Sequence, residues 1–214
     1  MDRRQRIAIV GAGLGGLAVA GFLQRAGFAA TVYEQAPTFS RICAGIILSA
    51  NVTKALRRLG IEQDLVASGL KPHCYISRAW DTGETLYEII FDASSEARFG
   101  GPYLNIHRGD LHAVMHGAVT PGSISFNHRL VALEELSGAI RLVFDNGVKV
   151  DADIVIGADG INSKVREFVV DAEPPRFVGA VAHRAIFPTQ RLRGFKYPIA
   201  PNGGVATGIS SRIS

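Results

Sequence analysis

A glycine-rich turn near the N-terminus constrains the fold of this chain more than any other segment. The turn carries the pattern G-x-G-x-x-G and holds four glycines, Gly11, Gly13, Gly15 and Gly16. The apolar residues 7–10 before it predict a buried strand, and residues 14–26 after it predict a helix that Gly27 ends. A second strand is expected at 30–34. Because a right-handed crossover joins two such strands, residues 6–34 predict a βαβ unit in a parallel sheet.

The spacing of the glycines suits a site for nucleotide phosphates. Gly11 permits the tight turn, Gly13 lets the backbone approach a pyrophosphate, and Gly16 lets the helix pack on the strand. The helix N-terminus adds free N–H groups and a partial positive charge. Glu34 ends the second strand, where an acid accepts hydrogen bonds from an adenosine ribose and repels a 2′-phosphate. The unit therefore predicts a site for an FAD- or NAD-like nucleotide and disfavours NADP there. A turn without a ligand, and an ordinary carboxylate at a strand end, are the alternatives.

The composition excludes several other classes of protein. Of the 214 residues, 47% are hydrophobic and 20% are charged, which excludes a disordered tail or a coiled coil. The net charge of +4 is spread along the chain, so we expect no nucleic-acid partner. Cys43 and Cys74 are the two cysteines, which fits a reducing, cytoplasmic location. Glycines interrupt the apolar run at 7–23, so we expect no signal peptide or membrane anchor.

A second chemical signal follows a strand expected at 154–156, in the order G-A-D-G-x-x-S-x-V-R. Asp159 lies just after this strand, and ligands bind at the carboxyl ends of strands in open α/β sheets. Its carboxylate can accept hydrogen bonds from sugar hydroxyls, although an Asp-Gly pair after a strand is often only a turn. Asn162 or Ser163 is expected to cap a helix at 163–169.

A third signal is Arg108, placed between a strand expected at 103–107 and a helix at 109–118. A guanidinium at such a turn can clamp a phosphate, and the spacing equally allows a surface ion pair with Asp110.

Two histidines on that helix, His112 and His116, are four residues apart and could together ligate a metal. The residues between them are Ala-Val-Met, so the acid of the zinc-protease motif is absent. We therefore expect no metal site.

The remaining pattern places further elements along the chain. Residues 73–91 alternate apolar and polar, which predicts an antiparallel excursion, and 124–150 predicts a β-meander with a hairpin turn at Asn146-Gly147. Residues 35–50 are expected to form a loop. The other expected elements are helices at 51–58 and 63–67 and a strand at 178–187.

These three signals, in this order, resemble the FAD-dependent aromatic hydroxylases, single-component flavin monooxygenases of the p-hydroxybenzoate, salicylate and 6-hydroxynicotinate hydroxylase type. The resemblance covers residues 6 to about 187 and implies an α/β fold. It implies a Rossmann-like FAD-binding domain at 1–174, with antiparallel β insertions near 73–91 and 124–150, and the beginning of a substrate-domain sheet at 175–214. The family's third motif, Gly-Asp-Ala-Ala-His-like, does not occur, so the expectation is a C-terminally truncated substrate domain.

The resemblance also implies which residues bind FAD: Gly11, Gly13, Gly15, Gly16, Glu34, Gln35, Arg41, Arg108, Leu130 and Asp159. Arg108 would contact the pyrophosphate, and Leu130 the adenine region through its backbone. Arg41 matches the loop beside the flavin, and Asp159 belongs to a motif implicated in both FAD and NAD(P)H binding. Ile47 stands where the hydroxynicotinate branch has a His, so no catalytic residue is assigned.

The activity implied by the resemblance is hydroxylation of a small aromatic acid. NADH or NADPH would reduce FAD, and the reduced flavin would use oxygen to hydroxylate the ring. The resemblance is compatible with a homodimer. Two alternatives stay open: a fragment that binds FAD or an adenine nucleotide without hydroxylase activity, and another flavoprotein oxidoreductase that uses two dinucleotides.

Overall fold

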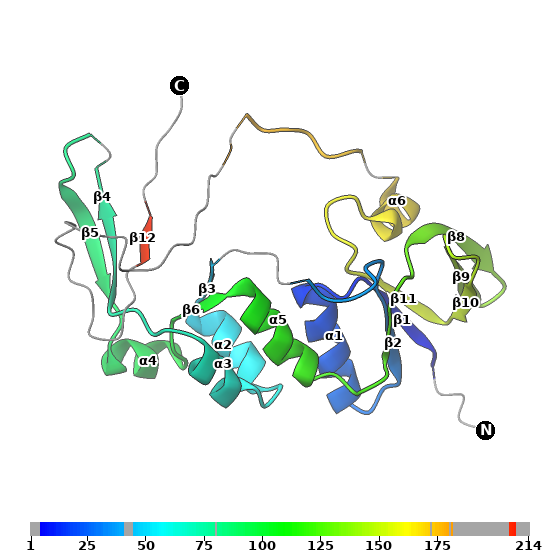
Figure 1. Cartoon of the computed structure of the whole chain (residues 1–214), viewed down its shortest axis with the longest axis horizontal. Helices are drawn as coiled ribbons and strands as arrows, with labels where there is room; N and C mark the ends of the chain where they lie inside the picture. Colours follow the sequence, from blue (N-terminus) through cyan, green and yellow to red (C-terminus); the bar gives the residue numbers. More distant parts are fainter. Residues whose placement is uncertain are drawn as a thin grey trace. The chain divides into compact units, whose positions relative to one another are not determined.

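The structure is a computed structural model (Figure 1) that describes residues 5–40, 45–79, 81–171, 173–179, 181 and 206–208. The chain divides into two compact units. Unit 1 comprises Met1–Ser40 and His112–Val178, and unit 2 comprises Arg41–Leu111 and Gly179–Ser214. In the described part of the chain, no helix is long and apolar enough to cross a membrane.

Unit 1 contains a four-stranded parallel sheet with the order β11-β1-β2-β7. Its strands are β1 (Ile7–Val10), β2 (Ala30–Tyr33), β7 (Ile124–Ser125) and β11 (Ile154–Gly157). All of β1 is buried, and it is a central strand of the sheet, between β2 and β11. The helix α1 (Leu14–Arg25) links β1 to β2, and Gly27 follows it with φ +91°. The expected βαβ unit is therefore confirmed.

A second sheet of unit 1 packs against the parallel sheet. It is antiparallel and consists of β8 (Leu130–Leu136), β9 (Ala139–Phe144) and β10 (Lys149–Ala152). Leu142 and Phe144 of this sheet share a buried cluster with Ala8 and Val10 of β1. Val165, from the helix α6 (Lys164–Val170), belongs to the same cluster. Figure 1 shows α6 beside β8, over the sheet that holds β1 and β11.

The meander prediction is correct for β8 to β10 and wrong for the first strand. Gly147 takes φ +83° in the expected hairpin turn, where the Phe144 amide donates to the Val148 carbonyl at 3.0 Å. In contrast, β7 pairs in parallel with β2, with Val32 opposite Ile124. A strand of two residues is too short to show an alternation of apolar and polar residues, so its partner strand depends on the tertiary fold and not on the local sequence pattern.

The buried strand expected at 154–156 is only partly covered. Ile154 is 36% exposed, and Val155 and Ile156 are half-buried. In the described part of the chain, β11 is an edge strand of its sheet, which explains the difference.

Unit 2 holds two smaller sheets and short helices. In one sheet β3 (Gly45–Leu48) pairs antiparallel with β6 (Leu104–His107). In the other, β4 (Cys74–Arg78) pairs antiparallel with β5 (Thr85–Ile90) and parallel with β12 (Ala206–Gly208). The helices are α2 (Ala50–Arg57), α3 (Glu62–Ser68), α4 (Ala93–Phe99) and α5 (Arg108–Gly117), the last of which continues into unit 1.

Two expectations differ from the structure or lie partly outside the described residues, and one helix was not expected. The loop expected at 35–50 contains β3, whose partner strand lies about sixty residues further along the chain. The helix α4 was not expected, although Asp92 caps it by accepting a hydrogen bond from the Ser95 amide at 2.9 Å. Of the strand expected at 178–187, residues 178, 179 and 181 are not in a strand, and the others lie outside the described residues.

The contact between Gly16 and the Gly11 turn gives a test of this packing. A Cβ at Gly16 would lie 1.8 Å from the Gly11 carbonyl oxygen, whereas a Cβ at Gly15 would meet nothing within 4 Å. We expect Gly16→Ala to lower the free energy of unfolding by about 1–3 kcal/mol, as overpacked sites do. Gly15→Ala should be neutral or stabilising, by up to about 1 kcal/mol. Urea unfolding followed by circular dichroism measures both, and equal stabilities would contradict the packing.

The strand β5 gives a second test, because all six of its residues are exposed. Leu86, Tyr87, Ile89 and Ile90 are 49–62% exposed, and β5 is an edge strand in the described part of the chain. Such an edge favours association between molecules. We expect Ile89→Lys to reduce association of the 214-residue chain in size-exclusion chromatography with light scattering. Val169→Lys, on the exposed face of α6, is the matched control and should leave it unchanged; an unaltered mass for Ile89→Lys would refute the role of β5.

Candidate functional site

A cavity of about 240 Å³ lies in unit 1 at the carboxyl ends of β1, β2 and β11. Its walls come from the glycine turn, the residues after β2, the start of β8 and the turn after β11. The structure brings together six of the residues singled out in the sequence, namely Gly11, Gly13, Glu34, Gln35, Leu130 and Asp159. This is the edge of a parallel sheet at which ligands bind in open α/β folds.

The glycines of the turn are needed for different reasons. Gly11 has φ +97°, and a Cβ there would lie 2.5 Å from the Ala158 carbonyl oxygen. Gly13 has φ −67°, which any residue adopts, and a Cβ there would meet no protein atom within 4 Å. The protein's own packing therefore does not explain a glycine at this position, which lines the cavity. An open face at Gly13 leaves room for a ligand to approach the backbone.

Glu34 connects the glycine turn to the segment after β2. One carboxylate oxygen, Oε2, accepts a hydrogen bond from the Ala12 amide at 2.7 Å, and Oε1 accepts one from the Ala36 amide at 2.9 Å. The carboxylate is therefore fixed at the cavity wall. Each oxygen keeps a lone pair that can accept a hydrogen bond from a ligand hydroxyl.

An aromatic cluster lies behind Glu34. The ring of Tyr33 stacks on Phe144 with centroids 5.1 Å apart, and His128 contacts both rings at 5.5 and 5.0 Å. Burial raises the pKa of the Tyr33 hydroxyl above its ordinary value. Tyr33 and His128 also line the cavity, so this part of its wall is aromatic.

Asp159 is turned toward the N-terminus of α6. Its Oδ2 accepts hydrogen bonds from the amides of Lys164 at 2.7 Å and Val165 at 3.2 Å, and its Oδ1 accepts one from the Ser163 hydroxyl. The Ser163 hydroxyl in turn accepts from the Arg166 amide at 2.9 Å, so Ser163 is the helix cap. The Asp159 carboxylate thus holds the turn after β11 in place at the cavity wall.

His112 is a contact of the glycine turn that the sequence did not indicate. Its Nε2 donates a hydrogen bond to the Ala12 carbonyl at 2.8 Å, across 100 residues of chain. Its ring lies edge-on against Phe39, with centroids 4.3 Å apart. Phe39 also contacts His116 at 5.0 Å and Phe126 at 4.9 Å. The sequence placed His112 only in a possible metal pair, because no local pattern reveals a partner so far away.

The other expected site residues stand apart from the cavity or cannot be placed in it. Gly15 and Gly16 lie in the first turn of α1 and do not line it. Arg41 lies outside the described residues. Arg108 is an exposed residue at the start of α5 and belongs to unit 2.

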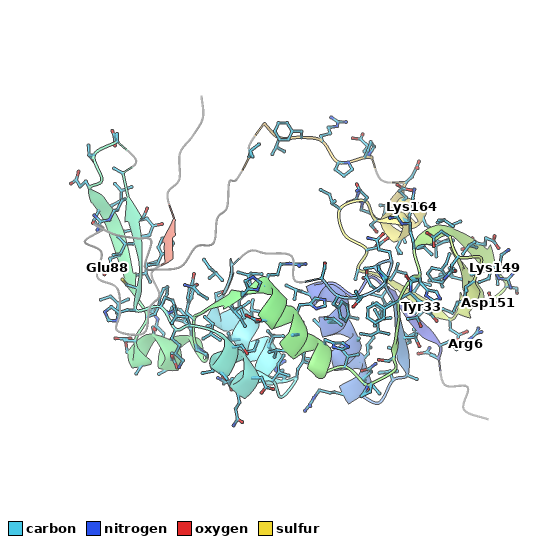
Figure 2. All side chains as sticks on the ribbon, viewed as in Figure 1. Arg6, Tyr33, Glu88, Lys149, Asp151 and Lys164 are labelled. Atoms are coloured by element: carbon cyan, nitrogen blue, oxygen red, sulfur yellow. The ribbon has the colours of Figure 1, made fainter. Side chains whose placement is uncertain are left out.

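Two basic residues of the cavity wall were missed by sequence reasoning. Arg129, just before β8, is exposed, and Lys164 begins α6. Figure 2 labels Lys164 together with Tyr33 of β2. The Lys164 ammonium pairs with Glu167 at 2.7 Å on the helix surface. Isolated basic residues in a polar stretch carry no recognisable signal until the fold places them.

The arrangement can hold a polar nucleotide. A fixed carboxylate suits ribose hydroxyls, and the first turn of α1, which has no acidic residue, presents free amides to phosphates. The wall supplies aromatic surface from Tyr33 and positive charge from Arg129.

Curated relatives with named activities match most of this chain. It is 48% identical over 189 residues to 6-hydroxynicotinate 3-monooxygenase of Bordetella bronchiseptica, covering 88% of this chain and 49% of the relative. It is 42% identical over 198 residues to the enzyme of the same name from Pseudomonas fluorescens, covering 92% and 51%. A 3-amino-4-hydroxybenzoate 2-monooxygenase of Streptomyces cremeus is 37% identical over 196 residues, covering 92% and 50%. The chain thus spans about half the length of the curated relatives it matches.

Solved structures with the same fold include flavoproteins. HpxO of Klebsiella pneumoniae, complexed with FAD and uric acid, matches with a TM-score of 0.73 and 26% identity, over 82% of this chain and 44% of that one. The 2,6-dihydroxypyridine-3-hydroxylase of Arthrobacter nicotinovorans matches with a TM-score of 0.65 and 26% identity, over 79% and 40%. These likenesses confirm the expected α/β fold.

The family described as FAD binding domain matches residues 4–174, which contain every part of the cavity wall. With its glycine turn, its fixed carboxylate and its relatives among the aromatic monooxygenases, this chain belongs to the FAD binding domain family.

Proposed function

We propose that this chain is the FAD-binding part of a monooxygenase that hydroxylates a small aromatic or heteroaromatic acid with oxygen and NADH or NADPH. The observation that carries the proposal is the open face of Gly13 in the cavity, beside a carboxylate fixed by two backbone amides. The named activities of the relatives supply the reaction class.

The residues of the cavity fit the ADP part of FAD. The Glu34 carboxylate would accept hydrogen bonds from the ribose hydroxyls, and the amides at the start of α1 would face the pyrophosphate. The backbone at Leu130, at the cavity wall, would meet the adenine. As the resemblance implies, Arg108 is proposed to contact the pyrophosphate, and Arg41 is proposed to belong to the loop beside the flavin.

FAD, when bound, supplies the electron transfer and oxygen chemistry of the reaction. The chain's own residues bind and orient it. Ile47, 48% exposed on β3, has no group that can move a proton, although the resemblance aligns it with a His in the hydroxynicotinate branch. We therefore propose an aromatic acid as the substrate class and leave the ring unassigned within that class.

The presence of Glu34 does not decide whether NADH or NADPH is the reductant. Its carboxylate would repel a 2′-phosphate, but the proposal gives this site to the adenosine of FAD. Either NADH or NADPH is compatible with this account.

One prediction of the proposed function concerns FAD binding by the 214-residue chain. Added FAD should co-elute with the protein in gel filtration and show flavin absorbance bands. Gly13→Ala should weaken FAD affinity at least about tenfold, because its methyl group would occupy the ligand's approach to the backbone. Gly15→Ala is the matched control, since its methyl group also meets no protein atom but does not line the cavity.

Equal FAD affinity in the Gly13 and Gly15 variants would contradict this placement of the pyrophosphate. If both variants lost FAD binding while their urea unfolding was unchanged, the turn would contact FAD at Gly15 as well, which would also contradict this placement.

Another prediction separates the proposed monooxygenase from a unit that only binds nucleotide. The FAD-loaded chain, mixed with aromatic acids, should oxidise NADH or NADPH and release a hydroxylated product detectable by mass spectrometry. Bound FAD with no NAD(P)H oxidation under any of these acids would assign this chain nucleotide binding alone.

A further inference from the structure

We propose that His112 is a positioning residue of the dinucleotide site, which sets the direction of the Gly13 amide by holding the Ala12 carbonyl. The proposal rests on the proposed function of the cavity. Every residue that it uses belongs to unit 1.

Ala12 is held on both sides. Its amide donates to Glu34 Oε2 at 2.7 Å, and its carbonyl accepts from His112 Nε2 at 2.8 Å. The whole residue is only 1% exposed, so it cannot turn without breaking these contacts. The two hydrogen bonds therefore fix the two peptide groups that flank Ala12, between the glycines at 11 and 13.

The planar peptide transmits this restraint to Gly13. In a trans peptide the carbonyl and the following N–H point to opposite sides. The carbonyl of Ala12 points at His112, so the Gly13 N–H points away from the imidazole. That N–H is among the amides that a helix leaves free at its start, and Gly13 is the residue before α1. A glycine without this restraint could rotate its peptide at little steric cost.

The imidazole is itself held in place. A carbonyl only accepts hydrogen bonds, so Nε2 of His112 must carry the proton. Phe39 packs edge-on against the ring at 4.3 Å and follows the segment that contains Glu34. His112 thus links the helix α5 to the glycine turn, and through Phe39 to the residues after β2. A hydrogen bond with a purely structural role could be made to any buried carbonyl. This one is made to Ala12, the residue between Gly11 and Gly13 of the glycine turn.

The test compares ligands that carry phosphate with one that does not. We expect His112→Leu to weaken binding of ADP and FAD about tenfold, the effect of one well-placed hydrogen bond. Adenosine should bind unchanged, because the Glu34 carboxylate, which is proposed to bind the ribose hydroxyls, is left intact. His112→Gln places an amide donor near the position of Nε2 and should restore most of the ADP affinity. His116→Leu, which loses a contact to Phe39 but none to Ala12, is the matched control and should bind all three ligands normally.

Isothermal titration of the 214-residue chain measures these affinities. Unchanged ADP affinity in His112→Leu, or equal losses for ADP and adenosine, would overturn the role of His112 while leaving the nucleotide site in place. A wild-type chain that binds neither ADP nor FAD would overturn the proposed function and this role with it.

A second readout needs no ligand. Nitrogen-15 NMR of the imidazoles should show His112 as the Nε2–H tautomer with a slowly exchanging proton. An Nδ1–H tautomer would overturn the proposal whatever the binding data show.

Discussion

The absence of a side chain at Gly16 allows α1 to lie directly on the turn that follows β1. The Gly11 carbonyl occupies the place where a Cβ of residue 16 would be, only 1.8 Å from it. Because α1 begins at this contact, its free amides are brought to the carboxyl end of β1, where the cavity opens. The contact that packs α1 closely on the turn after β1 therefore also presents the N-terminus of α1 to a ligand.

Two carboxylates hold the loops around the cavity by accepting hydrogen bonds from backbone amides. Glu34 joins the glycine turn to the segment after β2, and Asp159 fixes the turn after β11 to α6. These hydrogen bonds order the loops around a site that the sheet alone would leave irregular. Glu34 therefore has a structural role in addition to its proposed role toward the ribose, and replacing it would disturb both.

The sequence predicted the elements whose signals are local. The apolar strand, the glycines and the helix at 14–26 follow each other without interruption, and the hairpin at Asn146-Gly147 is a two-residue signal. Two of the misses depend on the fold around the strand: β3 pairs with a strand about sixty residues away, and β7 has only two residues. The same holds for the site, where the glycines and Glu34 were visible but the contact of His112 with Ala12 was not. The helix α4 was missed although its cap, Asp92, is a local signal.

The central claim is that the cavity beside Gly13 binds the ADP part of FAD. Titration of the nitrogen-15-labelled chain with ADP, followed by amide NMR, tests it most directly. The account predicts that the largest shifts fall on the amides of Gly13 and its neighbours in the turn and on the residues after β2, with smaller shifts at Leu130. No shift at the turn, or the largest shifts on residues far from the cavity, would contradict it.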